Sequence, residues 1–178
     1  LGAWLRARKV DPAAVTVGSK WGYIYTADWR VDAEVHEVKD HSLAVLQQQW
    51  QESRRNLGPY LRLYQIHSAT LESGVLGNLP ILRELARLKA GGTAIGLTLS
   101  GVGQVEVLRR AMTLRIDGAR LFDCVQATWN LLEPSAGSEL AAARHENIGV
   151  IVKEALANGR LAGRDARLAA KVSVLERE

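Results

Sequence analysis

The chain has 178 residues, a formal net charge of +4 and a pI near 9.5, and 47% of its residues are hydrophobic. These values exclude the disordered and fibrous classes and are typical of one globular domain. The basic residues are scattered. Their densest cluster, Arg6, Arg8 and Lys9, comes without a helix-turn-helix spacing or an RNA-stacking motif, so we expect no nucleic-acid partner.

The sequence also bears on compartment and membrane. It contains no apolar stretch of the roughly 20 residues that a membrane-spanning helix needs, and no signal peptide opens it. Cys124 is the only cysteine, which excludes an internal disulfide, and its place inside an apolar run indicates a buried, inert thiol. We therefore expect a soluble, cytoplasmic protein, although Leu1 at the first position leaves the natural start open.

Taken in chain order, helical and strand-like segments alternate. Apolar residues at helical spacing predict helices over residues 1–8, 42–57, 79–88, 102–112 and 138–145. Short runs rich in Val, Ile and Leu predict strands over residues 15–20, 61–67, 94–100, 122–130 and 149–154. No linker divides the chain, so we expect a single domain over residues 1–178 that ends in a polar helix over residues 164–178.

This alternation predicts an α/β fold, either an open doubly wound sheet or part of a (β/α)8 barrel. A complete barrel has eight strands and about 250 residues, so about five parallel βα units make only a partial TIM barrel. In both folds the polar residues at the strand ends meet at one edge of the sheet. These residues are Lys20, His67, Ser100, Asn130 and Lys153.

Lys20 and His67 end two consecutive strands and are the candidate catalytic residues. Taken singly, a lysine just past a strand is more often a surface residue, and a histidine at a strand end is more often structural. In a barrel, however, consecutive strands are neighbours, so an ammonium group and an imidazole at their ends can face one pocket. That pairing suits proton transfer or the polarisation of a carbonyl group.

Several segments together resemble the aldo-keto reductases. The strand ends that carry the lysine and the histidine, the helix between them, the sixth strand and the loop after the seventh all have counterparts in the family, in the family's order. The matching segments are residues 17–22, 63–67, 41–42 with 53–58, 125–126 with 130–133, and 155–161. The resemblance implies a (β/α)8 barrel of which this chain holds approximately strands three to seven.

The resemblance further implies an oxidoreductase that reduces aldehydes or ketones without a metal and uses a nicotinamide cofactor, NADP or, less commonly, NAD. Lys20 would lower the pKa of a tyrosine acid, and His67 would orient and polarise the substrate carbonyl. Thr98, Gln126, Lys153, Leu156 and Gly159 stand where the family binds its cofactor. Trp21 and Trp129 adjoin strand-end polar groups and are candidates for the wall of a small carbonyl substrate's pocket.

The chain departs from the family in ways that bear on activity. The catalytic tyrosine and aspartate normally precede the helix that residues 1–5 resemble, and neither has a match here. Tyr23 and Tyr25 follow Lys20 and lie in the wrong position to replace the tyrosine. Leu99 stands where the family commonly has asparagine, and Lys153 where an aromatic residue is common. We therefore expect this chain alone to be inactive.

Two other functions are compatible with the sequence. A barrel lyase would use Lys20 or Lys153 to form a Schiff base, and a non-catalytic protein would bind cofactor or a partner without turnover. The histidines show no metal-ligand spacing, so we expect no metal. Residues 101–106 contain half of a dinucleotide-binding fingerprint without its third glycine, which weakens a Rossmann interpretation. Two open sheet edges also predict self-association.

Overall fold

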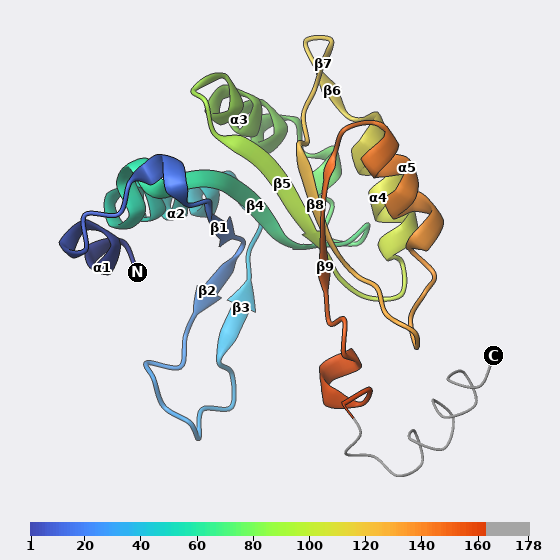
Figure 1. Cartoon of the computed structure of the whole chain (residues 1–178), viewed down its shortest axis with the longest axis horizontal. Helices are drawn as coiled ribbons and strands as arrows, with labels where there is room; N and C mark the ends of the chain where they lie inside the picture. Colours follow the sequence, from blue (N-terminus) through green and yellow to red (C-terminus); the bar gives the residue numbers. More distant parts are fainter. Residues whose placement is uncertain (163–178) are drawn as a thin grey trace.

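A five-stranded parallel sheet forms the centre of the molecule (Figure 1), as the computed structural model of residues 1–162 shows. The strand order is β1-β4-β5-β8-β9, so each strand lies beside the next one in the sequence. These strands comprise Val17–Trp21, Leu61–Ala69, Ala94–Leu99, Cys124–Thr128 and Gly149–Lys153. The prediction of about five parallel βα units is confirmed, whereas the helix predicted over residues 164–178 lies outside the described residues.

Five α-helices alternate with these strands, as predicted. They are α1 (Gly2–Ala7), α2 (Leu43–Leu57), α3 (Leu79–Ala90), α4 (Gln104–Thr113) and α5 (Gly137–His145). Short 3-10 turns, η1 to η4, comprise Pro12–Ala14, Gly58–Tyr60, Val75–Gly77 and Ala157–Gly159. Ser42 caps α2 by accepting from Val45 N at 3.3 Å, a bond that satisfies one of the free N–H groups of the first turn.

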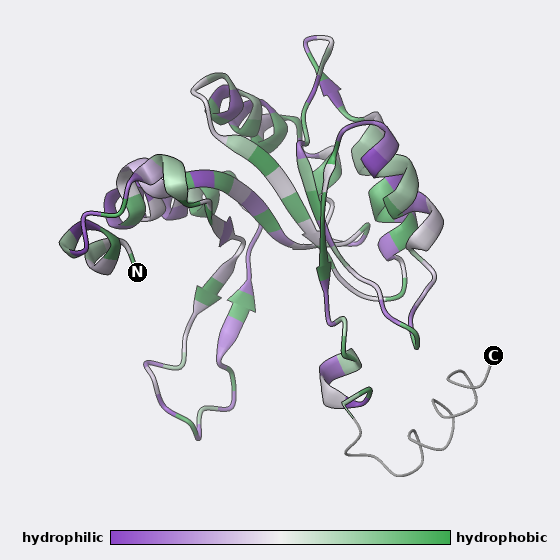
Figure 2. Ribbon diagram, in the orientation of Figure 1, coloured by the Kyte–Doolittle hydropathy of each residue, from purple (hydrophilic) through white to green (hydrophobic). Residues whose placement is uncertain are grey.

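The helices cover one face of the sheet, and the hydrophobic core lies between them. Side chains on a strand alternate between its two faces. Tyr64, Ile66, Leu97 and Val125 point toward the helices, are fully buried and belong to one hydrophobic cluster. Figure 2 shows hydrophobic segments along both the sheet strands and the helices. We call the opposite side of the sheet the helix-free face.

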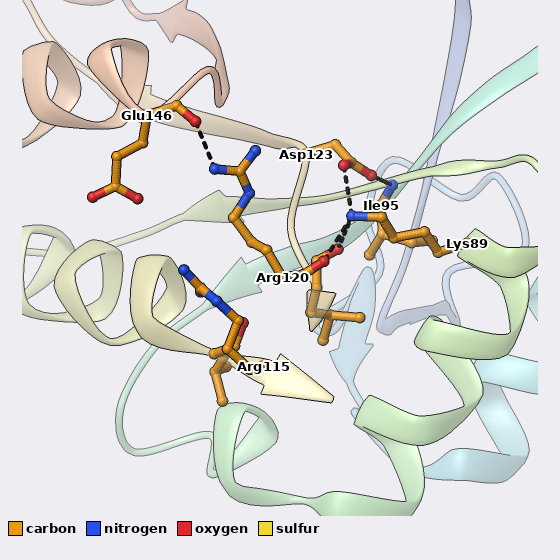
Figure 3. Close-up of polar contacts among 8 residues, drawn as sticks. Lys89, Ile95, Arg115, Arg120, Asp123 and Glu146 are labelled. Carbon is orange, nitrogen blue, oxygen red and sulfur yellow. Dashed lines mark hydrogen bonds and ion pairs between the residues drawn. The ribbon is translucent and has the colours of Figure 1, made fainter. Parts of the chain in front are cut away.

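A polar cluster fixes the amino-terminal edge of the sheet (Figure 3). Lys89 at the end of α3 donates its ammonium protons to Arg120 O at 2.8 Å, Leu121 O at 3.1 Å and Asp123 Oδ1 at 2.7 Å. Asp123 Oδ2 in turn accepts from Ile95 N at 2.9 Å, which joins β5 to the start of β8. In a barrel this end of the strands serves stability, and catalysis takes place at the other.

Two antiparallel hairpins were not predicted from the sequence. One joins β2 (Tyr23–Tyr25) to β3 (Glu37–Lys39), and the other joins β6 (Arg115–Ile116) to β7 (Ala119–Arg120). Their strands are two or three residues long and largely exposed, so they lack the apolar runs by which strands are recognised. The β2–β3 hairpin follows β1 after only Gly22 and therefore starts at the carboxyl edge of the sheet.

Candidate active site

The candidate residues gather on the helix-free face near the carboxyl ends of the strands. Thr98 pairs in register with Gln126, and Lys153 with Thr128, two residues further along β8. Paired residues share a face, and so do residues two apart on one strand. Gln126 and Lys153 therefore lie on one side of the sheet, and the same rule places Lys20 and His67 on that side through the pairing of Lys20 with Gln65.

His67 projects from an irregular point in β4. The pairing of β4 with β5 shifts between Ile66 and Ala69, and Ser68 has a φ of 52°, in the left-handed region. Such bulges re-aim side chains and are common next to active sites. His67 thus leaves the strand where the backbone bends.

Three side chains from separate elements hold the backbone of this bulge. His41, before α2, has its Nε2 2.9 Å from His67 O. Thr98 Oγ1 accepts from Ser68 N at 2.7 Å, and Lys39 Nζ donates to Ser68 O at 2.8 Å. The Thr98 hydroxyl therefore positions the peptide after His67, a contact that its assignment as a cofactor ligand did not anticipate.

His41 itself requires a glycine nearby. A Cβ on Gly22 would lie 2.4 Å from the His41 ring, and Gly22 has a φ of 114°. A side chain at position 22 would displace His41 and, with it, the contact to His67 O. This role of His41 was not predicted, because a single histidine at a helix start carries no recognisable signal in the sequence.

The surroundings of His67 favour its neutral ring, and partial burial is the main cause. Burial lowers the pKa of His67 below its usual value, and the charge of Lys20 lowers that pKa further. Glu37 raises the pKa, and Lys153 lowers it slightly. Lys20, Glu37 and Lys153 come from three different strands, β1, β3 and β9. A neutral imidazole retains one N–H donor.

Lys20 and His67 line one cleft of about 390 Å³, together with Tyr23. The cleft lies along β1, which forms the outer edge of the sheet in the described part of the chain, and reaches Ser53 and Asn56 of α2.

Cys124 is buried, and burial raises the pKa of its thiol, in agreement with an inert cysteine.

The two tryptophans expected in the substrate pocket differ in where they lie. Trp21 follows Lys20 and so points to the opposite, helix-covered face, where it is 1% exposed and part of the core. Trp129 lines a hollow with Leu140 and Val152, between α5 and β9, again on the helix side. Trp21 is nevertheless among the residues that line the cleft at His67, whereas Trp129 is not.

The remaining cofactor candidates fit a nicotinamide dinucleotide in part. Gln126 is half-buried on the helix-free face and forms no side-chain hydrogen bond with described residues. Lys153 is 3.7 Å from Glu154 Oε1. Leu156 and Gly159 were expected to offer backbone N–H groups to the cofactor. The N–H of Gly159 already donates to Leu156 O at 3.0 Å, whereas the N–H of Leu156 has no acceptor in the described part of the chain.

The described residues contain neither a metal-binding cluster nor a membrane-spanning helix. Within residues 1–162, no three His, Cys, Asp or Glu side chains gather in a way that could hold a metal ion. In the part of the chain that the structure describes, every helix is too short or too polar to cross a membrane.

Comparisons with known proteins agree with this geometry. The family model described as "Aldo/keto reductase family" matches residues 1–178. Among solved structures, a Pseudomonas aeruginosa protein assigned as an aldo-keto reductase is 28% identical, with a TM-score of 0.67 over 89% of this chain and 56% of its own. The glycerol dehydrogenase AKR11B4 of Gluconobacter oxydans is 23% identical, with a TM-score of 0.64 over 91% of this chain and 47% of its own. At this identity the likeness supports a shared fold and nothing more.

A second structure assigned as an aldo-keto reductase of Pseudomonas aeruginosa is 27% identical, with a TM-score of 0.63 over 85% of this chain and 53% of its own. No protein of curated function matches the chain. The chain thus spans about half the length of the solved structures it resembles. From the family match and the parallel βα sheet, we conclude that this chain belongs to the aldo/keto reductase family.

Proposed function

We propose that the chain carries the carbonyl-reducing site of an NAD(P)H-dependent oxidoreductase that acts on small aldehydes or ketones, with NADP as the expected cofactor and NAD as the alternative. One observation carries the proposal most: Lys20 and His67 line the same cleft at the carboxyl edge of the sheet. Two such residues at the ends of neighbouring strands suit the polarisation of a carbonyl group.

Each residue has a distinct part in this proposal. His67, with its neutral ring, donates its N–H to the substrate's carbonyl oxygen and stabilises the negative charge that develops there. Lys20 adds a positive charge beside the same oxygen. The bound nicotinamide supplies the hydride. Gln126 offers an amide to the nicotinamide carboxamide, and the N–H of Leu156 offers a donor to the pyrophosphate.

The reaction also needs a proton for the alkoxide that hydride addition produces. The family's tyrosine and aspartate have no match in this sequence, so no general acid is assigned here. General acid catalysis contributes about 10²- to 10⁴-fold in rate. We therefore propose that this chain alone binds NADPH but shows little or no turnover.

Fluorescence titration with NADPH, followed by an assay of NADPH oxidation with an aldehyde, tests the proposal. We expect saturable binding that Gln126→Leu weakens and that Gln48→Leu leaves unchanged, because Gln48 is exposed on α2 and its side-chain amide donates to Glu52. Oxidation at the rate of a complete reductase would show that another residue supplies the proton. Absence of NADPH binding would contradict the cofactor assignment.

The two alternatives give different results in the same experiments. A lyase would leave a covalent adduct on Lys20 or Lys153 after borohydride treatment with a carbonyl substrate. A non-catalytic binding protein would bind NADPH without turnover even when the missing acid is supplied. We further propose a cytoplasmic location and self-association through the open sheet edges.

A further inference from the structure

The β2–β3 hairpin presents one face to the active site. Tyr23 pairs with Lys39 across the two strands, and Tyr25 pairs with Glu37. Directly paired residues, and residues two apart, lie on the same face of an antiparallel pair. These four side chains therefore share one face of the hairpin. The other face carries Ile24 and Val38, which are both exposed.

Contacts with β4 show which way the shared face points. The ring of Tyr23 meets the ring of His67 edge-on, with centroids 4.7 Å apart and planes at 62°. Lys39 Nζ lies 5.6 Å from the centre of the Tyr23 ring while it donates to Ser68 O. Figure 1 shows the hairpin extending from the sheet on the side where η4 also lies, beyond the carboxyl ends of the strands.

The aromatic surface continues away from His67 along the hairpin. Tyr25 is two residues beyond Tyr23 on the same face, a step of about 7 Å along a strand. Its ring lies 5.4 Å from that of Trp29, with planes at 52°. We call Tyr23, Tyr25 and Trp29 the aromatic row. It begins in contact with His67 and ends in the loop between β2 and β3.

The outer end of the row is unusually open to solvent. Tyr25 is 50% exposed and Trp29 is 88% exposed, although burial of an aromatic ring is favourable. Trp29 also has a φ of 62°, a left-handed conformation that is rare for a bulky residue and that recurs at ligand-binding sites. The backbone turn is fixed by the bond from Arg30 N to Ala27 O at 2.8 Å.

We propose that the aromatic row is a substrate-specificity subsite, which binds the flat apolar part of an aromatic aldehyde or ketone. The inference rests on the proposed function, because it takes the substrate's carbonyl group to lie at His67. A carbonyl carbon at that point places its substituent against the Tyr23 ring, and a fused-ring substituent extends toward Tyr25 and Trp29. Offset and edge-to-face contacts between aromatic rings give the row its preference for flat ligands over flexible polar ones.

Binding of unreactive amides tests the subsite without turnover. Amide carbonyls form no Schiff base with lysine, so we choose 2-naphthamide as the probe and acetamide as its small counterpart. Saturation-transfer NMR on the whole chain should show 2-naphthamide bound through its rings and acetamide unbound. Trp29→Ala and Tyr25→Ala should each weaken 2-naphthamide binding about three- to tenfold, the range expected for one lost aromatic contact.

Trp4→Ala is the matched control, because Trp4 is 56% exposed on α1 and distant in sequence from the hairpin. It should leave the affinity unchanged. Equal affinity in wild type and Trp29→Ala, or an equal loss in Trp4→Ala, would overturn the proposal. So would a Trp29→Ala variant whose sedimentation shows lost self-association while 2-naphthamide binding is unchanged, since the row would then contact a second copy. If NADPH fails to bind but 2-naphthamide binding still depends on Trp29, the proposed function fails and the subsite stands.

Discussion

Gln104 replaces a missing strand contact at the carboxyl end of β8. Thr98 of β5 pairs with Gln126 of β8, and β5 ends one residue later, so Thr128 has no partner on that strand. The buried side chain of Gln104, at the start of α4, takes that place. Its Nε2 donates to Thr128 O at 3.0 Å and its Oε1 accepts from Thr128 N at 3.1 Å. The side-chain amide thus imitates a neighbouring peptide group.

Gln104→Leu keeps a side chain of similar size and removes both hydrogen bonds. Each buried backbone group left without a partner costs about 1–3 kcal/mol. Because Thr128 is half-buried and water can reach part of it, we expect the free energy of unfolding to fall by about 2–4 kcal/mol. In a chain of this size each kcal/mol lowers Tm by about 2–4 °C, which makes the expected decrease on the order of 10 °C.

Urea unfolding followed by far-UV circular dichroism measures this difference. Gln48→Leu serves as the control, because Gln48 is exposed on α2 and should change stability by less than about 0.5 kcal/mol. If Gln104→Leu is no more destabilising than the control, the Thr128 peptide does not depend on the Gln104 amide, and our reasoning about the end of β8 is wrong.

Three further predictions concern the amino-terminal cluster, pH and association. Lys89→Met should lower the free energy of unfolding by about 1–2 kcal/mol, because the Lys89 and Asp123 side chains are about one-third exposed and solvent weakens their ion pair. A double-mutant cycle with Asp123→Asn should show that the two losses of unfolding free energy are not additive. Burial lowers the pKa of both His41 and His67 in the folded state, so the unfolded chain takes up protons first as the pH falls. The contribution of these histidines to stability is therefore present above about pH 6.5 and is lost as the pH falls through their pKa values in the folded state. The urea midpoint should therefore decrease between pH 7 and 5, and a midpoint that rises would contradict the assigned direction. The chain should sediment as an oligomer at low micromolar concentration because β1 and β9 are the edge strands of the sheet within residues 1–162, whereas one monomeric species with a single sharp thermal transition would disprove this.

The strands and helices of the βα units were predictable because their apolar spacing follows from burial. In β4, for instance, Tyr64 and Ile66 face the helices and are fully buried. The alternation of side chains also placed Lys20 and His67 on one face. The same rule, applied to the residues that follow Lys20 and Thr128, would have placed Trp21 and Trp129 on the other face, where the structure has them.

Other features depend on contacts between distant residues and left no local pattern. The bulge that re-aims His67 is held by Lys39, His41 and Thr98, whose contacts with it span 26 to 30 residues of sequence. The β2–β3 hairpin has short, exposed strands that resemble a loop in sequence. Its packing against His67 follows from the ring of Tyr23 and could be found only in three dimensions.

The central claim is that Lys20 and His67 act as one site, and a titration of His67 tests it most directly. The pKa of the His67 ring, followed by NMR in wild type and in Lys20→Met, should lie below the usual histidine value and should rise when the lysine charge is removed, because a nearby positive charge disfavours the imidazolium. Lys9→Met, which removes an exposed lysine from the end of α1, should leave that pKa unchanged. An identical His67 titration in wild type and Lys20→Met would show that the two side chains do not share a cleft, and would contradict the site proposed for this chain.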